Sequence, residues 1–152
     1  MTRARASFTR EELESSTTVL SFEDRTVKFQ DVDAAGTIYF PKVLEYFADN
    51  YLTLLTRAGL DVPRMLRTRE GAAPLAHAEA SFFQPLFFGD AVRVEIRCVK
   101  VGSSSVSFGH RLAKGDQTAA IGTTVHVFVD AQFQKANVPE RLAAHLRALQ
   151  AQ

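Results

Sequence analysis

Apolar side chains recur along the middle of this chain with the spacing of one helical face. Between Pro41 and Ala58, they return every three or four positions, and a second apolar row widens the stripe. Pro41 suits the first turn because its missing N–H would have no intrahelical acceptor there. Gly59 can end the helix in a left-handed conformation. The pattern therefore predicts a long helix over 41–58, apolar enough around its girth to be buried.

Outside this segment, apolar and polar residues alternate as they do in β-strands. The five expected strands lie at 18–30, 74–83, 91–101, 104–114 and 117–130. In the third strand, Cys98 falls on the apolar side with Val94. In the last, odd-numbered residues from Ile121 to Val129 form the apolar side, and His126 lies opposite them. Turns that contain glycine separate the later strands.

Helical patterns also occur near both ends of the chain. Thr9 and Glu12 have the spacing of a capping box, with Phe8 and Leu13 placed as a hydrophobic staple, which predicts a short helix at 9–15. Two further segments are expected to be helical, one within 60–73 and an amphipathic one at 139–151 that is capped near Asn137.

The order of these elements defines the expected fold class. One strand, one buried helix and then four strands give an α+β order. An antiparallel sheet must cover one of its faces, and the only long apolar helix is 41–58. We therefore expect an N-terminal extension with a short helix, 1–17, followed by a single domain, 18–152. In that domain an antiparallel sheet wraps around the long central helix.

Composition and charge narrow the classes of partner. The formal net charge of the 152 residues is only +1, which predicts neither nucleic acid nor an anionic membrane as a partner. No apolar run is long enough to span a bilayer, and the N-terminus has no apolar signal core. Cys98, the single cysteine, cannot form an internal disulfide. The expectation is a cytoplasmic protein.

Two aspartates stand just before the long helix, in the pattern Asp31-x-Asp33-x-x-Gly36. The pattern opens like an EF-hand loop, but Ala35 and Lys42 occupy the positions of a side-chain ligand and of the bidentate glutamate. It is not a phosphate-binding glycine loop either, because no Lys-Ser/Thr pair follows. A purely structural role, as a helix cap or dipole partner, stays open for either aspartate.

The helix start that follows adds a chemical possibility. Asp33 precedes small residues and the flexible Gly36, so its carboxylate can face open space. The first N–H groups of a helix have no intrahelical acceptors and carry the positive end of its dipole. Pro41 has no N–H, so the amide of Phe40 is the best-placed donor on the loop side. Such a donor can polarise a thioester carbonyl and hold the developing oxyanion.

The segment 27–55 resembles the signature of hotdog-fold acyl-CoA thioesterases of the 4-hydroxybenzoyl-CoA thioesterase type. In that family a strand ends in Asp-x-Asp-x-x-Gly before the buried helix. The stretch 74–90 is similar to the family's second strand and its Pro-x-x-x-Gly-Asp turn, and the similarity runs over 23–131. The Asp-Ala-Ala-Gly and Pro-x-x-His-Ala patterns most resemble the 1,4-dihydroxy-2-naphthoyl-CoA thioesterases.

This resemblance implies roles for particular residues. Asp33 takes the position of the catalytic aspartate, and the backbone amide of Phe40 that of the group that polarises the thioester carbonyl. Asp31 is then expected to order the loop. Gly36 and Tyr39 are expected to contact the substrate.

Two residues outside the loop are also candidates for substrate binding. His77 can hydrogen-bond an aromatic acyl hydroxyl, or it can be an interface or ordinary strand histidine. Glu45 lies on the long helix, where another branch of hotdog thioesterases carries its catalytic carboxylate. In this chain Glu45 is expected at the pocket edge or at a subunit interface.

The expected activity is hydrolysis of an acyl-CoA thioester, with aryl-CoA esters such as hydroxybenzoyl- or dihydroxynaphthoyl-CoA favoured. Asp33 would act as nucleophile or as general base. No metal or redox cofactor is expected, because coenzyme A is part of the substrate. Release of a product from acyl carrier protein is one alternative, and a non-catalytic module that binds acyl-CoA is another. Open sheet edges predict a dimer or a dimer of dimers.

Overall fold

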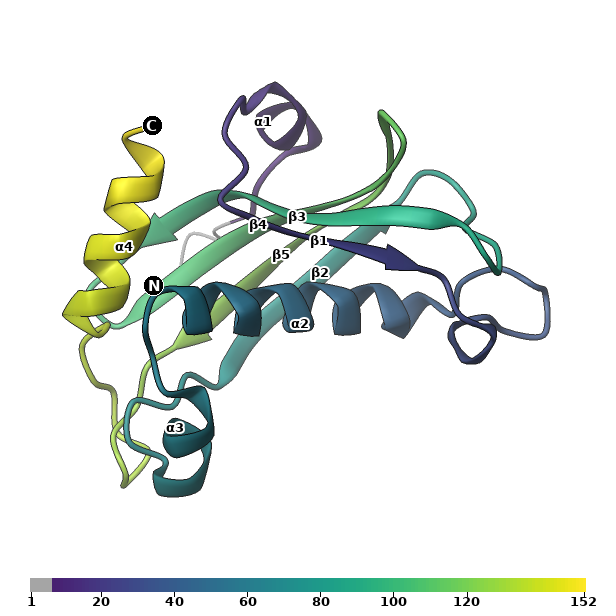
Figure 1. Ribbon diagram of the computed structural model, residues 1–152. Helices are drawn as coiled ribbons and strands as arrows, with labels where there is room; N and C mark the ends of the chain where they lie inside the picture. Colours follow the sequence, from purple (N-terminus) through teal and green to yellow (C-terminus); the bar gives the residue numbers. More distant parts are fainter. Residues whose placement is uncertain (1–6) are drawn as a thin grey trace.

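Five antiparallel strands form one sheet in the order β1-β3-β4-β5-β2 in the computed structural model, which describes residues 7–152 (Figure 1). The strands are β1 (Ser21–Thr26), β2 (Leu75–Phe82), β3 (Ala91–Val101), β4 (Ser105–Lys114) and β5 (Gln117–Val127). The helices are α1 (Arg10–Ser15), α2 (Phe40–Arg57), α3 (Val62–Thr68) and α4 (Glu140–Gln150). A short 3-10 helix, η1 (Phe29–Asp31), takes up the end of the predicted first strand. The order of elements confirms the α+β class.

The long helix α2 lies along one face of the sheet, and α1 lies on the opposite face (Figure 1). Val43, Phe47 and Leu54 of α2 have no exposed surface. Gly122 of β5 allows the helix to approach closely, because a Cβ atom there would lie 2.5 Å from Cε2 of Phe47. The predicted wrapping of an antiparallel sheet around a buried helix is therefore confirmed.

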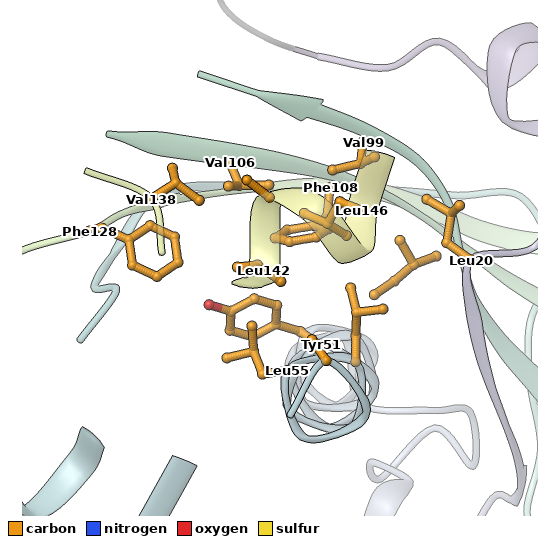
Figure 2. Close-up of a cluster of buried hydrophobic side chains, with 14 of the residues drawn as sticks. Leu20, Tyr51, Leu55, Val99, Val106, Phe108, Phe128, Val138, Leu142 and Leu146 are labelled. Carbon is orange, nitrogen blue, oxygen red and sulfur yellow. The ribbon is translucent and has the colours of Figure 1, made fainter. Parts of the chain in front are cut away.

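The C-terminal helix α4 closes the core beside the C-terminal half of α2. Its residues Leu142 and Leu146 share one apolar cluster with Tyr51 and Leu55 of α2 and with Phe108 of β4 (Figure 2). All five side chains are buried. This cluster fills the end of the core that is remote from the start of α2.

The cap of α4 was predicted near Asn137, and the structure places it at Pro139. The N-cap residue is Pro139, which makes no side-chain capping bond. The N–H of the preceding residue, Val138, donates to the carbonyl of Ser103 at 2.9 Å, and the Val138 side chain is buried. This contact with the β3–β4 turn holds the chain extended up to the point where the helix begins.

The predicted capping box of α1 is confirmed. Thr9 Oγ1 accepts the N–H of Glu12 at 3.1 Å, and Glu12 Oε2 accepts the N–H of Thr9 at 2.7 Å. The adjoining Phe8 and Leu13 pack over Gly109, where a Cβ atom would lie 2.7 Å from the Leu13 side chain. Residues 1–6 of the predicted extension lie outside the described residues.

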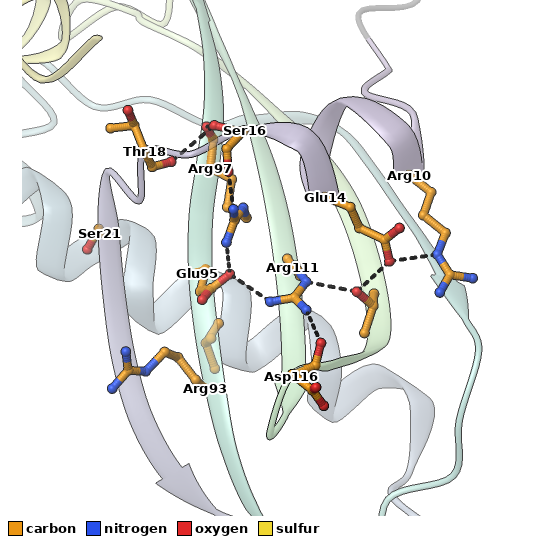
Figure 3. Close-up of polar contacts among 12 residues, drawn as sticks. Arg10, Glu14, Ser16, Thr18, Ser21, Arg93, Glu95, Arg97, Arg111 and Asp116 are labelled. Atoms are coloured by element: carbon orange, nitrogen blue, oxygen red, sulfur yellow. Dashed lines mark hydrogen bonds and ion pairs between the residues drawn. The ribbon is translucent and has the colours of Figure 1, made fainter. Parts of the chain in front are cut away.

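A network of hydrogen bonds and ion pairs between side chains links α1 to the outer face of the sheet (Figure 3). Glu95 of β3 is buried, and its Oε2 lies 2.8 Å from Nη1 of Arg97 and 3.3 Å from Nη1 of Arg111. Arg111 Nε donates to Thr118 Oγ1, whose own proton goes to Glu14 of α1 at 2.7 Å. Glu14 of α1 is thus linked through Thr118 and Arg111 to Glu95 on the outer side of β3.

The predicted alternation of side chains fails at one position, Cys98 of β3. A β-bulge between Ile96 and Cys98 inserts one extra residue, which moves Cys98 to the outer face beside Phe8. On β5, Ile121 packs on the α1 side, and His126 faces α2 and stacks on its Tyr51. Ile121 and His126 thus lie on opposite sides of β5, as predicted, and the side with His126 faces α2, which strand periodicity alone does not reveal.

Candidate active site

Asp31 is buried at the entry to α2 and orders the loop, as expected. Its Oδ2 accepts the hydroxyl of Tyr46 at 2.6 Å and the N–H of Lys28 at 3.0 Å. Its carbonyl oxygen accepts the N–H of Tyr39 at 2.7 Å. Through these hydrogen bonds, Asp31 connects the segment that follows β1, the loop and the second turn of α2. Tyr46 was not identified from the sequence, because its partner lies on another element.

The charge state of Asp31 follows from these contacts. Burial by itself opposes ionisation, but the hydrogen bonds from Tyr46 and from the Lys28 amide outweigh it and hold the pKa of Asp31 below its ordinary value. Burial, and then the Asp31 carboxylate, raise the pKa of Tyr46. Asp31 is therefore an ionised acceptor facing a phenol that keeps its proton.

Asp33 is exposed and carries fewer contacts. Its main chain pairs with Thr37, the Asp33 N–H donating to the Thr37 carbonyl at 2.9 Å. Its Oδ1 accepts the N–H of Ala35 at 2.8 Å, which closes a tight turn, and Gly36 supplies the positive φ of 83° that the turn needs. Within residues 7–152, no donor is bonded to Oδ2 of Asp33. One carboxylate oxygen is thus held and the other faces outward.

The amide of Phe40 is the open donor at the start of α2. The N–H groups on either side of it are used: Tyr39 donates to Asp31, and Pro41 has no N–H. Among the described residues, the Phe40 N–H donates no hydrogen bond. It stands at the positive end of an 18-residue helix. A free N–H at this position is able to donate to an oxyanion.

The structure brings four of the predicted site residues onto one loop: Asp33, Gly36, Tyr39 and Phe40. Tyr39 is the N-cap residue of α2, and its exposed ring meets that of Phe40 edge to face at 5.4 Å. Glu45 is exposed one turn further along and pairs with Lys42 at 3.0 Å. It therefore lies beside the loop, on the solvent side of α2.

His77 is not brought to this loop by the protomer fold. It lies on β2, at the opposite edge of the sheet from β1, the strand that leads to Asp33. Its Nε2 is 3.2 Å from Oε2 of Glu79 on the same strand. In the described chain it is a partly buried edge-strand histidine.

Solved structures share this fold along most of the chain. A 1,4-dihydroxy-2-naphthoyl-CoA thioesterase from Synechocystis superimposes with a TM-score of 0.79 at 24% identity, covering 86% of this chain and 97% of its own. A gentisyl-coenzyme A thioesterase gives a TM-score of 0.74 at 22% identity, with 82% and 98% covered. A thioesterase from Thermus thermophilus, complexed with coenzyme A and Zn, gives 0.78 at 24% identity, with 90% and 98% covered. The fold is therefore the hotdog fold of thioesterases.

Sequence comparison assigns the family. The model of the Thioesterase-like superfamily matches residues 27–146, and the chain belongs to that family. A 1,4-dihydroxy-2-naphthoyl-CoA hydrolase from Thermosynechococcus vestitus is 30% identical over 126 residues, covering 82% of this chain and 86% of its own. The corresponding hydrolase from Synechococcus elongatus is 28% identical over 120 residues, covering 78% and 88%. The predicted class of enzyme, an acyl-CoA thioesterase, is confirmed.

None of the helices described within residues 7–152 is both long enough and apolar enough to cross a membrane.

Proposed function

We propose that this protein hydrolyses aryl-CoA thioesters at the loop between β1 and α2, with Asp33 as the catalytic carboxylate. One observation carries the proposal: the same loop holds an outward-facing carboxylate oxygen of Asp33 and the unbonded N–H of Phe40. A thioester whose carbonyl oxygen accepts the Phe40 N–H would present its carbon to that carboxylate or to a water beside it.

The reaction needs few groups. In the general-base route, Asp33 takes a proton from water while the water oxygen adds to the thioester carbon. The carbonyl electrons move onto the oxygen, where the Phe40 N–H and the helix dipole stabilise the charge. Collapse of this intermediate breaks the C–S bond, and the proton returns to the leaving thiolate of coenzyme A. In the nucleophilic route, Asp33 Oδ2 adds to the thioester carbon and the C–S bond breaks, which releases the coenzyme A thiolate and leaves a mixed anhydride. Water then hydrolyses the anhydride to the free acid and regenerates the Asp33 carboxylate.

Two considerations support an aromatic acyl group. The 1,4-dihydroxy-2-naphthoyl-CoA hydrolases to which this chain is similar are named for a hydroxylated aryl ester. The start of α2 also exposes aromatic rings, Tyr39 at 47% and Phe40 at 62% of their surface. Such rings offer stacking partners for a planar substrate. Gly36 leaves open space beside them, since no atom lies within 4 Å of the position of its missing Cβ.

A second copy of the chain would complete this site. β2 is an edge strand, and the flank of α2 nearest to it carries Leu44, Ala48 and Leu52 on one stripe. Leu52 is 39% exposed. Pairing through this edge gives a dimer, and a dimer of dimers would follow from a second contact. Sedimentation as a monomer at micromolar concentration would contradict this part of the proposal.

The decisive test is thiol release from a panel of hydroxybenzoyl-, hydroxynaphthoyl- and aliphatic CoA esters by the wild type, Asp33→Asn and Asp116→Asn. Asp116 is a matched control, because it is an exposed aspartate in the β4–β5 turn and not part of the loop between β1 and α2. Hydrolysis lost only in Asp33→Asn supports the assignment, and normal turnover by that variant overturns it. Faster release from acyl carrier protein thioesters would favour the carrier-protein alternative. Binding of CoA esters without thiol release would favour the non-catalytic module.

A further inference from the structure

Arginine side chains without a partner are concentrated at the end of α2 and around α3. Elsewhere in the described chain the guanidinium groups are bonded, as in Arg93, which pairs with Asp24 at 2.7 Å. By contrast, Arg57, Arg67 and Arg69 make no ion pair and no side-chain hydrogen bond within residues 7–152. All three are exposed. The cations that the fold leaves unpaired thus lie in one short segment.

This segment carries a local excess of positive charge. Residues 57–70 contain four arginines but only two carboxylates, whereas the whole chain has a formal net charge of +1. One of these carboxylates, Asp61, is engaged as the N-cap of α3, where its Oδ1 accepts the N–H of Arg64 at 3.0 Å. The other, Glu70, lies 3.9 Å from Arg64, and both side chains are largely exposed, so this pair binds weakly.

An exposed phenylalanine lies beside these arginines in a backbone conformation that disfavours it. Phe133 has a φ of 60° and is 56% exposed. Its turn is fixed by Asp130, whose Oδ1 accepts the N–H groups of Gln132 and Gln134, both at 2.9 Å. Glycine or asparagine is the usual residue where φ is positive. The fold gains little burial from this ring, so its role lies at the surface.

Arg69 is the other described non-glycine residue with a positive φ, 61°, and it contacts this ring. Its guanidinium carbon lies 5.6 Å from the centroid of Phe133. An exposed cation–π contact is weak, and it offsets only part of the strain of two such residues. Two unfavourable backbone conformations therefore hold a guanidinium group and an aromatic ring together on the surface.

Leu66 adds a second exposed apolar side chain. It lies on α3 and is 69% exposed. Arg64 and Arg67 are three residues apart on the same helix and therefore share one of its faces. Aromatic and arginine side chains are the types enriched where proteins bind one another. Apolar groups among unpaired guanidinium groups suit a partner that is acidic and carries apolar side chains of its own.

This surface is remote from the catalytic loop of the same protomer. Phe40 begins α2, whereas α3 follows the end of that helix (Figure 1). The 18 residues of α2 span about 27 Å at 1.5 Å per residue. A partner bound at α3 would leave the loop open.

We propose that Arg64, Leu66, Arg67, Arg69 and Phe133, which we call the α3 surface, dock an acidic segment of another protein. Charge complementarity selects this partner, because carboxylates are the groups that guanidinium pairs with most strongly in proteins and the described chain supplies too few of them here. The two apolar side chains would contact apolar residues of the same segment. This inference goes beyond the proposed function, since it does not involve the thioester.

The test measures peptide binding to the full chain by fluorescence anisotropy at low ionic strength. One labelled peptide is Glu-Glu-Leu-Glu-Glu-Phe-Glu-Glu, and in the second every Glu is Gln. The proteins are the wild type, Arg64→Gln/Arg67→Gln and the control Arg93→Gln/Arg147→Gln. The control removes the same charge from two exposed arginines that are already paired with carboxylates.

We expect the wild type and the control to bind the acidic peptide equally. Arg64→Gln/Arg67→Gln should bind it about three- to tenfold more weakly, as for two lost exposed ion pairs, and the Gln peptide should bind the wild type more weakly still. Equal weakening in both double variants would show unspecific attraction and overturn the proposal. Absence of binding to the wild type would overturn it as well.

Phe133→Gly separates docking from a structural role. The variant should unfold at about the wild-type temperature, because relief of strain offsets the greater freedom of glycine in the unfolded chain. It should bind the acidic peptide about three- to tenfold more weakly, since an aromatic contact is lost. Unchanged peptide binding by this variant would contradict the proposal.

Free coenzyme A is the competitor to exclude, because its phosphates also attract guanidinium groups. Displacement of the acidic peptide by coenzyme A at matched concentration would assign the α3 surface to the nucleotide end of a CoA ester and overturn the proposal. Retention of the peptide supports it. Thiol release by Arg64→Gln/Arg67→Gln should equal that of the wild type, and a raised KM for CoA esters would again overturn the proposal. The peptide assay does not depend on turnover, so it decides the matter even if the proposed function fails.

Discussion

Asp31 and Asp33 are separated by one residue, yet the fold places them in opposite environments. Asp31 is 7% exposed and receives the Tyr46 hydroxyl and the Lys28 amide on one oxygen. Asp33 is exposed, and one of its oxygens accepts a single bond from within its own turn. Burial with full hydrogen bonding thus makes Asp31 a structural anchor, whereas the Asp33 carboxylate keeps one oxygen available for chemistry.

The largest expected difference between the two aspartates is in turnover. Asp33→Asn should lower kcat for the best CoA ester by about 10²–10⁴, the usual contribution of a positioned acid or base. Its free energy of unfolding should change by less than about 0.5 kcal/mol, because the side chain is exposed. Thiol-release kinetics and urea unfolding measure the two quantities. A large loss of stability in this variant would erase the contrast with Asp31.

The converse substitution should act on stability. Asp31→Asn removes the charge from two buried hydrogen bonds, and we expect it to lower the free energy of unfolding by about 1.5–3 kcal/mol. Any fall in kcat should be smaller than in Asp33→Asn, since the loop is loosened but the catalytic carboxylate is kept. Chemical unfolding and kinetics on the same preparation decide this. An Asp31→Asn protein of normal stability would show that Asp31 does not anchor the loop.

Removal of the Tyr46 hydroxyl, which donates to Asp31, also tests whether Asp31 is a structural anchor. Tyr46→Phe leaves the buried Asp31 carboxylate with the Lys28 amide and should destabilise the protein by about 1–2 kcal/mol. Adding Asp31→Asn to Tyr46→Phe should cost less than it costs alone, because the two side chains interact directly. The coupling energy comes from a double-mutant cycle of unfolding experiments. Strict additivity would contradict the 2.6 Å contact as a source of stability.

The smallest expected effect appears in the pH dependence of stability. The pKa of Asp31 is below 3.8 in the folded state, so the unfolded chain binds the proton first, and the contribution of Asp31 is lost as pH falls below about 3.8. Asp31→Asn should flatten the unfolding curve in that acid range, and Asp33→Asn should leave its shape unchanged. Thermal unfolding measured at several pH values tests this.

Above about pH 4, the pH dependence of stability is expected to come from buried histidines. Burial lowers the pKa of His110 from 6.5 to about 3. The unfolded chain therefore binds this proton first, and stability is full above about pH 6.5 and falls between 6.5 and 3. Each unit of pH in that window costs at most about 1.4 kcal/mol for one such group. Both aspartate variants should share this slope, which serves as their common baseline.

Local patterns predicted much of the fold. The helix over 41–58 is found at Phe40–Arg57, and the Gly59 that was expected to end it has a φ of 81°. The capping box at Thr9 predicted α1 because both of its bonds are made within one helical turn. These features depend on neighbours in sequence, so a single chain displays them. Asp33, Gly36, Tyr39 and Phe40 came together for the same reason, since they share one short loop.

Other features depended on distant contacts and could not be predicted in this way. Strand periodicity predicted that Ile121 and His126 lie on opposite sides of β5, but it did not predict which side faces α2, because the outward-facing Ile121 is apolar and packs against Leu13 of α1 and Phe8. The bulge before Cys98 adds one residue to β3. The side chains beyond it therefore point to the faces opposite to those that a regular alternation predicts. The Tyr46–Asp31 bond and the stacking of Tyr51 on His126 both join α2 to other elements.

Periodicity, caps and turn chemistry are local, so the elements, their order, the family and the loop that carries Asp33 could be predicted from the amino-acid sequence. The burial of Asp31, the face of each strand that meets α2, and the stacking of Tyr51 on His126 became known from the folded structure. Burial and hydrogen-bond partners arise when segments far apart in the chain pack together. They are therefore properties of the folded protein.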